Sequence, residues 1–316
     1  MKIFVTGVCG QLGHDVVNEL YKRNAESGTD YVCIGSDIAP AYCGVADNSA
    51  VTTAKYVSLD ITDAKAVEET LLREDVDAVI HCAAWTAVDL AEDEDKKDKV
   101  KMVNSIGTLN LVNAVKKLDS VKESGCKFMY ISTDYVFNGQ GLTPWTPDCK
   151  EYAPLNVYGQ TKLDGELAVS ENLDKYFVVR IAWVFGRNGK NFIKTMLNLA
   201  KTHDTLRVVN DQIGTPTYTY DLARLVVDMI LTDKYGIYHV TNEGEYISWF
   251  DFAKAIFEEA GVTNMTVIPV TSEEYGAAAK RPYNSRMDRS KIVENGFEPL
   301  PDWRDALRRY VKILQG

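Results

Sequence analysis

The chain has 316 residues, enough for one large domain with an appended lobe or for two domains with a sizeable core. Its formal net charge of −10 at pH 7 and its pI near 5.0 argue against a nucleic-acid partner, which requires a basic face. No apolar stretch approaches the roughly 18 residues of a membrane span, and the first apolar run is too short for a signal peptide, so we expect no membrane partner and a cytoplasmic location. The six cysteines form no Cys-x-x-Cys pair, which favours reduced thiols and no metal site.

The N-terminal stretch has the order strand, glycine loop, helix. An apolar run at residues 2–6 (KIFVT) leads into a Gly-x-x-Gly-x-x-Gly loop, and apolar residues then recur at helical spacing. Glycines permit the tight turn, the close approach of the backbone to a pyrophosphate and the free N–H groups at the helix start. A glycine triplet alone is weak evidence, so the flanking strand and helix are what predict a dinucleotide site. Its cofactor-binding residues are predicted to be Gly7, Gly10, Gln11, Leu12 and Gly13.

Acidic residues follow the next two predicted strands. The strand at residues 31–36 ends at Asp37, where a carboxylate can accept hydrogen bonds from an adenosine ribose, although a turn aspartate is the alternative. No Lys or Arg follows Asp37 closely, which disfavours the extra phosphate of NADP and favours NADH. After the strand at residues 56–59, Asp60 and Ile61 are predicted to line the adenine edge, unless Asp60 starts the following helix.

The fourth predicted strand, residues 78–82 (AVIHC), is followed by Ala83 and Ala84. Small residues at the end of a strand allow the backbone to lie against a cofactor, although ordinary packing explains two alanines as well. The acidic run at residues 92–95 precedes two lysines, and we interpret it as a solvated helix face and not as a metal cluster.

A tyrosine and a lysine stand four residues apart after the fifth predicted strand, residues 127–132 (KFMYIS). Tyr158 and Lys162 would share one helical face, so that the ammonium could approach the phenol. A nearby cation favours the phenolate and would lower a pKa that is ordinarily about 10. A chain with 17 tyrosines contains about one such pair by chance, so the spacing alone fits an exposed surface pair equally well.

The second half of the chain is predicted to leave the nucleotide-binding domain and return to it. Strands at residues 177–181 and 237–240 extend the sheet, whereas residues 211–218 are broken by Gly and Pro and are loop-like. Amphipathic helices are predicted at residues 191–200, 221–231, 249–260 and 303–314. We expect an α/β, doubly wound domain from residues 1–185 plus about 219–242, and a smaller C-terminal α/β lobe from about 186–218 plus 243–316.

Several segments together resemble the extended short-chain dehydrogenase/reductases, and within them the dTDP-4-dehydrorhamnose reductase family. They are residues 6–13 (TGVCGQLG), 83–89 (AAWTAVD), 132–137 (STDYVF), 154–162 (PLNVYGQTK), 187–192 (RNGKNF), 211–217 (DQIGTPT) and 281–282 (RP). Each is weak alone, but their order over nearly the whole chain is specific. The resemblance implies a Rossmann NAD(P)-binding domain with a nucleotide-sugar lobe. It also implies reduction of the C4 keto group of dTDP-4-dehydro-L-rhamnose, a dTDP-linked 4-keto-6-deoxy sugar, by dissociable NADPH or NADH.

The resemblance also implies roles for four polar residues. Tyr158 is the acid that protonates the developing C4 oxygen, and Lys162 positions the nicotinamide ribose and assists ionisation. Thr133 is the hydroxyl that hydrogen-bonds the same oxygen, with Ser132 as a substitute. Physical chemistry agrees, because a carbonyl that accepts hydride develops alkoxide charge, which preorganised donors stabilise.

Three further residues are expected to contact substrate: Trp183, Asn191 and Arg281. The indole of Trp183 can cover a pyranose ring, and the guanidinium of Arg281 suits pyrophosphate oxygens. Some relatives dimerise through a metal such as Mg²⁺ held by acidic residues, and no such ligands are recognisable in this chain, so homodimerisation stays open. Cys9 departs from the family pattern and predicts sensitivity of the glycine loop to oxidants.

Two alternatives to a reductase remain at this point. One is a sugar-nucleotide epimerase on the same scaffold, which would recycle tightly held NAD. The other is a dinucleotide-binding regulatory subunit without turnover. The presence of Tyr158, Lys162 and Thr133 weighs against the second alternative.

Overall fold

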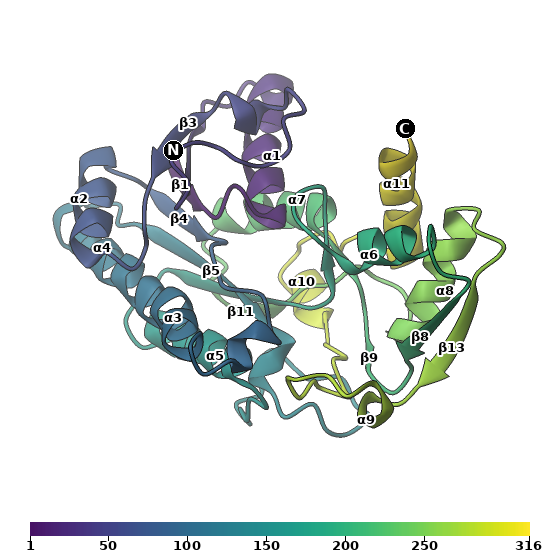
Figure 1. The fold of residues 1–316 in the computed structure, drawn as a ribbon. Helices are drawn as coiled ribbons and strands as arrows, with labels where there is room; N and C mark the ends of the chain where they lie inside the picture. The colour runs from purple at the N-terminus through teal and green to yellow at the C-terminus, as the bar shows by residue number, and fades with distance from the viewer.

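The computed structural model describes residues 1–316, and its centre is a seven-stranded sheet in the order β11-β6-β5-β4-β1-β2-β3 (Figure 1). Every strand pair in this sheet is parallel. The strands are β1 (Lys2–Thr6), β2 (Val32–Asp37), β3 (Lys55–Ser58), β4 (Ala78–His81), β5 (Lys127–Thr133), β6 (Tyr176–Ile181) and β11 (Gly236–His239). The strand order reverses between β1 and β4, which confirms the doubly wound sheet and places the ligand-binding crevice at that point.

Helices cover both faces of the sheet, and each face has its own hydrophobic core. Successive residues of β1 show the division: Ile3 and Val5 pack into one core, and Phe4 packs into the other. This alternation follows from the two-residue period of a strand, and burial on both faces explains why β1 is apolar throughout. The first core includes α1 (Gln11–Ser27) and α7 (Thr219–Ile230), and the second includes α2 (Ala64–Glu74), α4 (Gly107–Val121) and α5 (Val157–Ser170).

The C-terminal part of the chain forms a third core beside the sheet, on the right of Figure 1. Its buried residues include Phe185, Phe252 and Trp303. The covering elements are α6 (Phe192–Leu199), α8 (Trp249–Glu259), α11 (Trp303–Gln315) and the parallel pair β8 (Thr205–Val209) and β13 (Thr266–Val270). Ser248 caps α8, because it accepts a hydrogen bond from the Asp251 main chain within a reciprocal capping box.

Short elements account for most differences from the sequence-based expectation. Residues 211–218, predicted as a loop, contain two-residue strands, which pair only through tertiary contacts and leave no local pattern. These strands are β9 (Ile213–Gly214) with β12 (Ile247–Ser248), and β10 (Thr217–Tyr218) with β7 (Val184–Phe185). The remaining short elements are η1 (Ala50–Thr52), η2 (Leu90–Glu92), α3 (Lys97–Lys101), the π-helical turn η3 (Met102–Ile106), η4 (Asp134–Val136), α9 (Ser272–Tyr275) and α10 (Ser290–Glu294). None of the helices is long and apolar enough to span a bilayer.

Candidate active site

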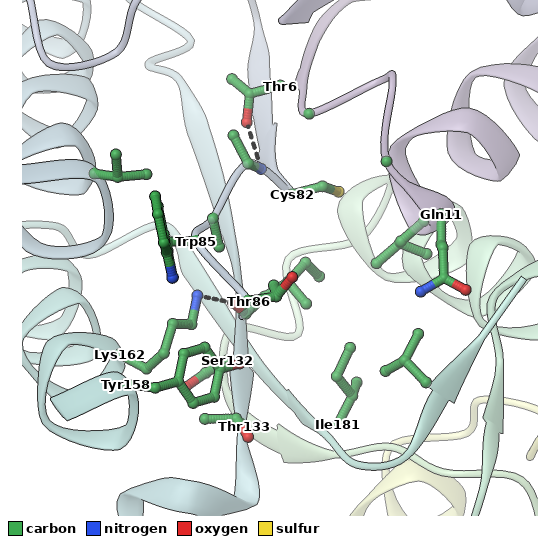
Figure 2. Close-up of a pocket in the computed structure, with 18 of the residues that line it drawn as sticks. Thr6, Gln11, Cys82, Trp85, Thr86, Ser132, Thr133, Tyr158, Lys162 and Ile181 are labelled. Atoms are coloured by element: carbon green, nitrogen blue, oxygen red, sulfur yellow. Dashed lines mark hydrogen bonds between the residues drawn. The ribbon is translucent and has the colours of Figure 1, made fainter. Parts of the chain in front are cut away.

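A cavity of about 830 Å³ opens at the carboxyl ends of the central strands. Loops that follow β1, β2, β4, β5 and β6 all contribute to its lining, together with α5. Tyr158, Lys162, Ser132 and Thr133 are grouped on one side of this pocket and Gln11 lies on the other (Figure 2). One cavity therefore joins the glycine loop to the predicted catalytic side chains.

The glycine loop has the geometry that a pyrophosphate needs. Gly7 has φ +72°, and a Cβ there would lie 2.6 Å from the Ala83 main-chain nitrogen. A Cβ on Gly13 would lie 2.3 Å from the Gly7 carbonyl oxygen, so the loop can close only without side chains. Helix α1 begins directly after Gly10, which provides no side-chain cap. The first N–H groups of α1 are therefore left to bind an anion, and the residues fit a dinucleotide.

The predicted adenosine-binding residues also line the pocket. The Asp37 carboxylate accepts hydrogen bonds from the main-chain N–H groups of Cys9, at 3.0 Å, and Ile38, at 2.8 Å. Asp60 accepts from the Thr62 main chain at 2.9 Å in a local turn. Asp60 does not start α2, because the cap of α2 is Asp63. Ile61 is buried at the edge of the pocket.

Asn104 braces the loop that contains Ala83 and Ala84, both of which line the pocket. Its side-chain oxygen accepts from the Trp85 main-chain N–H at 2.8 Å, and its amide donates to the Trp85 carbonyl at 3.1 Å. The same amide donates to the Thr161 hydroxyl at 3.1 Å. Asn104 lies in the π-helical turn η3, a type of irregularity that is frequent at functional sites. It thereby connects the cofactor loop to α5.

Lys162 is buried, with 3% of its surface exposed. Its Nζ donates to the Ile131 carbonyl at 2.7 Å, drawn as the dashed line that starts at Lys162 in Figure 2, and lies 4.1 Å from the Tyr130 ring centroid. Burial lowers the pKa of Lys162 to about 7, although the Glu166 carboxylate opposes the change. Two of the three ammonium hydrogens are left for a ligand.

The Tyr158 phenol has a raised pKa, contrary to the expectation from spacing. Burial is the main cause, the negative charge of Asp134 adds to it, and a hydrogen bond from Thr133 opposes it. Burial outweighs any lowering of this pKa by Lys162, whose ammonium donates to the Ile131 carbonyl. The phenol is therefore protonated at neutral pH, which is the state that a proton donor requires.

Thr133 and Ser132 have different partners. The Thr133 hydroxyl donates to Oδ1 of Asp134 at 3.0 Å. Ser132 donates to the Glu166 carboxylate, which also pairs with the fully buried Arg180 at 2.7 Å. Ser132 is thus engaged in a buried ion-pair network, and Thr133 is the hydroxyl beside the phenol.

Asp134 and Ser285 are site residues that the sequence-based prediction missed. Both are 2% exposed, and the Ser285 hydroxyl donates to Oδ2 of Asp134. Burial raises the pKa of Asp134 to about 6, while the hydrogen bonds from Ser285 and Thr133 oppose this rise. Asp134 directly follows Thr133, which was a usable signal. No local sequence pattern indicates Ser285, because it lies 151 residues after Asp134 in the chain.

Trp183 lies in the pocket in a strained conformation. Its φ is +51°, a region that non-glycine residues rarely adopt and that is commonly found at functional sites. Its indole stacks on Trp249, with ring centroids 3.8 Å apart and an interplanar angle of 16°. Trp249 also lines the pocket and was not predicted.

The structure does not place Asn191 and Arg281 in the pocket lining. Asn191 caps α6 and donates to the Gly186 carbonyl and the Tyr310 hydroxyl, each at 2.9 Å, so its polar atoms serve the scaffold. Arg281 pairs with Asp89 at 2.6 Å. Asn191 thus caps α6 outside the pocket lining, and its contact with substrate stays a prediction.

The acidic run at residues 92–95 is divided between two roles. Glu94 and Asp95 form exposed ion pairs with Lys97 and Lys96, as a solvated face would. Glu92 instead accepts from the Val157 main-chain N–H at 2.8 Å, at the start of α5. No group of three or more His, Cys, Asp or Glu side chains is arranged to share a metal ion.

Comparisons with known proteins agree along the full chain. The family model described as RmlD substrate binding domain matches residues 1–315. The spore coat polysaccharide biosynthesis protein SpsK of Bacillus subtilis is 36% identical over 98% of this chain and 97% of that protein. A crystal structure of a dTDP-4-dehydrorhamnose reductase from Clostridium acetobutylicum is 38% identical, with a TM-score of 0.85 and 100% of both chains covered. The Bacillus anthracis dTDP-4-dehydrorhamnose reductase in complex with NADP is 36% identical, with a TM-score of 0.83 and 99% of both chains covered. This chain therefore belongs to the RmlD substrate binding domain family, as its resemblance to dTDP-4-dehydrorhamnose reductases predicted.

Proposed function

We propose that this protein is an NAD(P)H-dependent oxidoreductase that reduces the C4 keto group of dTDP-4-dehydro-L-rhamnose to give dTDP-L-rhamnose. One observation carries the proposal: a single pocket contains a glycine loop shaped for a dinucleotide and, facing it, Tyr158, Lys162 and Thr133. The relatives named dTDP-4-dehydrorhamnose reductase support the choice of substrate.

Tyr158 is the proposed proton donor. A bound nicotinamide supplies the hydride of such a reduction. The C4 oxygen then develops alkoxide charge, which is far more basic than a phenol, so the proton moves from the Tyr158 hydroxyl to that oxygen. Burial, by keeping the phenol protonated beforehand, prepares Tyr158 for this step.

Lys162 and Thr133 have supporting roles in the proposal. Lys162 holds the nicotinamide ribose with the hydrogens that the Ile131 carbonyl leaves free, and its positive charge stabilises the phenolate left after proton transfer. Thr133 hydrogen-bonds the substrate oxygen beside Tyr158 once its hydroxyl hydrogen is released from Asp134, and this donor stabilises the developing charge.

The proposed substrate contacts are an aromatic pair and Arg281. We assign Trp183 and Trp249 to the apolar face of the sugar, because a planar indole covers a pyranose ring. Arg281 would contact the pyrophosphate after its ion pair with Asp89 breaks and the phosphate oxygens take the place of the Asp89 carboxylate. The proposed lobes are the ones predicted from the sequence, residues 1–185 plus about 219–242 and residues 186–218 plus 243–316.

The coenzyme is NADPH or NADH. The complex of the Bacillus anthracis relative with NADP supports the first, and the Asp37 carboxylate in the pocket supports the second. Homodimerisation and a cytoplasmic location remain predictions from the sequence.

The proposal is tested by following nicotinamide absorbance with the purified protein, dTDP-4-dehydro-L-rhamnose and either NADPH or NADH. We expect substrate-dependent oxidation of at least one coenzyme and formation of dTDP-L-rhamnose. Matched reactions with UDP-linked and GDP-linked 4-keto-6-deoxy sugars show which nucleotide base the protein accepts in its substrate. Oxidation of neither coenzyme with any of these sugars would contradict a reductase function.

A further inference from the structure

Two cysteines from separate loops meet beside the dinucleotide pocket. Cys9 belongs to the glycine loop and lines the pocket, whereas Cys43 is exposed in the loop after β2. The Cys43 main-chain N–H donates to Cys9 Sγ at 3.1 Å.

The contact between these loops is fixed by Asn188, which is 1% exposed. Its side-chain oxygen accepts from the Val45 main-chain N–H at 2.8 Å, and its amide donates to the Gly10 carbonyl at 3.2 Å. Gly44 permits the approach, since a Cβ there would lie 2.3 Å from the Asn188 amide nitrogen. Cys43 is therefore held against the glycine loop through the contacts of Gly44 and Val45 with Asn188.

We propose that Cys9 and Cys43 are a thiol pair that a hydroperoxide converts into a reversible disulfide, and that this disulfide and a bound dinucleotide exclude one another. The proposal rests on the dinucleotide-binding part of the proposed function and not on the identity of the sugar. A disulfide bond is roughly 2 Å long, so its formation draws the Cys9 side chain toward the outer loop. The Cys9 main-chain N–H donates a hydrogen bond to the Asp37 carboxylate. The movement therefore disturbs both the glycine loop that would bind the pyrophosphate and the carboxylate that would bind the ribose.

The chemistry is a two-electron oxidation in two steps. Exposed Cys43 meets the oxidant first: its thiolate attacks one oxygen of hydrogen peroxide, the O–O bond breaks, and a sulfenic acid and a hydroxide form. The hydroxide takes up the proton that the Cys43 thiol released, which gives one water. The Cys9 sulfur then attacks the Cys43 sulfur, the S–O bond breaks, and the departing hydroxide takes the Cys9 proton as a second water. Burial raises the pKa of the Cys9 thiol to about 12, which keeps Cys9 from reacting first.

The experiment compares reduced protein with protein treated with hydrogen peroxide. Peptide mass spectrometry locates the disulfide, and fluorescence titration with NADPH and NADH gives the dissociation constants. We expect a Cys9–Cys43 cross-linked peptide, dissociation constants raised at least tenfold, recovery with dithiothreitol, and cross-linking slowed at least tenfold by saturating dinucleotide.

Matched variants separate this pair from general oxidation. Cys43→Ser lies outside the pocket lining and should bind dinucleotide normally while losing both the cross-link and the peroxide effect. Cys149→Ser, which removes a cysteine elsewhere, should behave as the wild type. Absence of the cross-link, or a cross-link with unchanged affinity, would overturn the proposal while dinucleotide binding by the reduced protein still supports the reductase. Failure of the reduced protein to bind either dinucleotide would overturn both.

Discussion

The Thr133 hydroxyl donates a 3.0 Å hydrogen bond to Oδ1 of Asp134, so the state of a buried carboxyl sets the direction in which this hydroxyl points its hydrogen. An ionised Asp134 can only accept, which keeps the hydrogen away from the substrate oxygen. A protonated Asp134 can donate to Thr133 and release that hydrogen for the substrate. Asp134 is thus a positioning residue for Thr133.

This relationship predicts a pH dependence of kcat. Burial raises the pKa of Asp134 to about 6, so ionisation above that pH should lower kcat by removing the Thr133 donor. The expected loss is on the order of tenfold, below the effect of deleting an oxyanion donor outright. In Asp134→Asn this inflection should disappear, and in Ser285→Ala it should move to higher pH because Ser285 normally lowers the pKa. An unchanged pH profile in both variants would show that Asp134 does not act on the reaction.

Coenzyme preference should respond to Asp37. The carboxylate repels the extra phosphate of NADPH, and Asp37→Asn removes the charge while retaining an oxygen for the Cys9 N–H. We expect the ratio of NADPH to NADH affinity to rise about tenfold, corresponding to ~1.4 kcal/mol. Equilibrium titration of both coenzymes measures this ratio. An unchanged ratio would show that the adenosine ribose does not bind beside Asp37.

Asp15 predicts a pH effect on stability, separate from catalysis. It is 5% exposed and accepts from the Thr219 hydroxyl, and burial raises its pKa to about 7. Between the unfolded pKa of about 3.9 and this value the folded protein binds more protons than the unfolded chain. The contribution of Asp15 is therefore fully present below pH ~3.9 and is lost as the pH rises toward 7, by up to ~1.4 kcal/mol per pH unit.

The test is urea unfolding of the wild type and Asp15→Asn at several pH values. The asparagine does not ionise and can still accept from Thr219, so the variant should gain stability relative to the wild type as the pH rises from 5 to 8. A constant difference between the two proteins across this range would show that Asp15 does not titrate in this window.

Removing one partner of the ion pair behind the active site should strongly destabilise the fold. Arg180 is fully buried and makes two hydrogen bonds to Glu166, at 2.9 and 2.7 Å. Glu166→Gln leaves the guanidinium without a compensating charge, which typically costs about 3–5 kcal/mol. Glu94→Gln, at an exposed pair that solvent screens, should have a far smaller effect. Similar losses in the two variants by chemical denaturation would contradict this difference.

Local sequence patterns predicted the central architecture because they reflect local physics. Strands such as β1 are buried on both faces and read as apolar runs, and the cap at Ser248 has a local signature. The pair β8 and β13 was missed because their residues are partly exposed and their partnership is set by tertiary packing.

The site was predicted where chemistry lies close in sequence and missed where it depends on distant contacts. Tyr158, Lys162 and Thr133 share one pocket wall, as their order suggested. The raised pKa of Tyr158 could not be predicted from spacing, because burial outweighs the charge of a lysine that is directed elsewhere. Ser285 and the Cys9–Cys43 contact come from segments that only the folded chain brings together.

The most direct measurement of the central claim is the turnover of Tyr158→Phe with dTDP-4-dehydro-L-rhamnose and saturating coenzyme, beside Tyr135→Phe as a neighbouring phenol whose ring centroid lies 5.5 Å away. If Tyr158 delivers the proton, Tyr158→Phe should lower kcat by roughly 10²–10⁴-fold with coenzyme affinity unchanged, and Tyr135→Phe should lower it by less than about tenfold. Wild-type turnover by Tyr158→Phe, or a loss explained wholly by weaker coenzyme binding, would contradict the proposed mechanism.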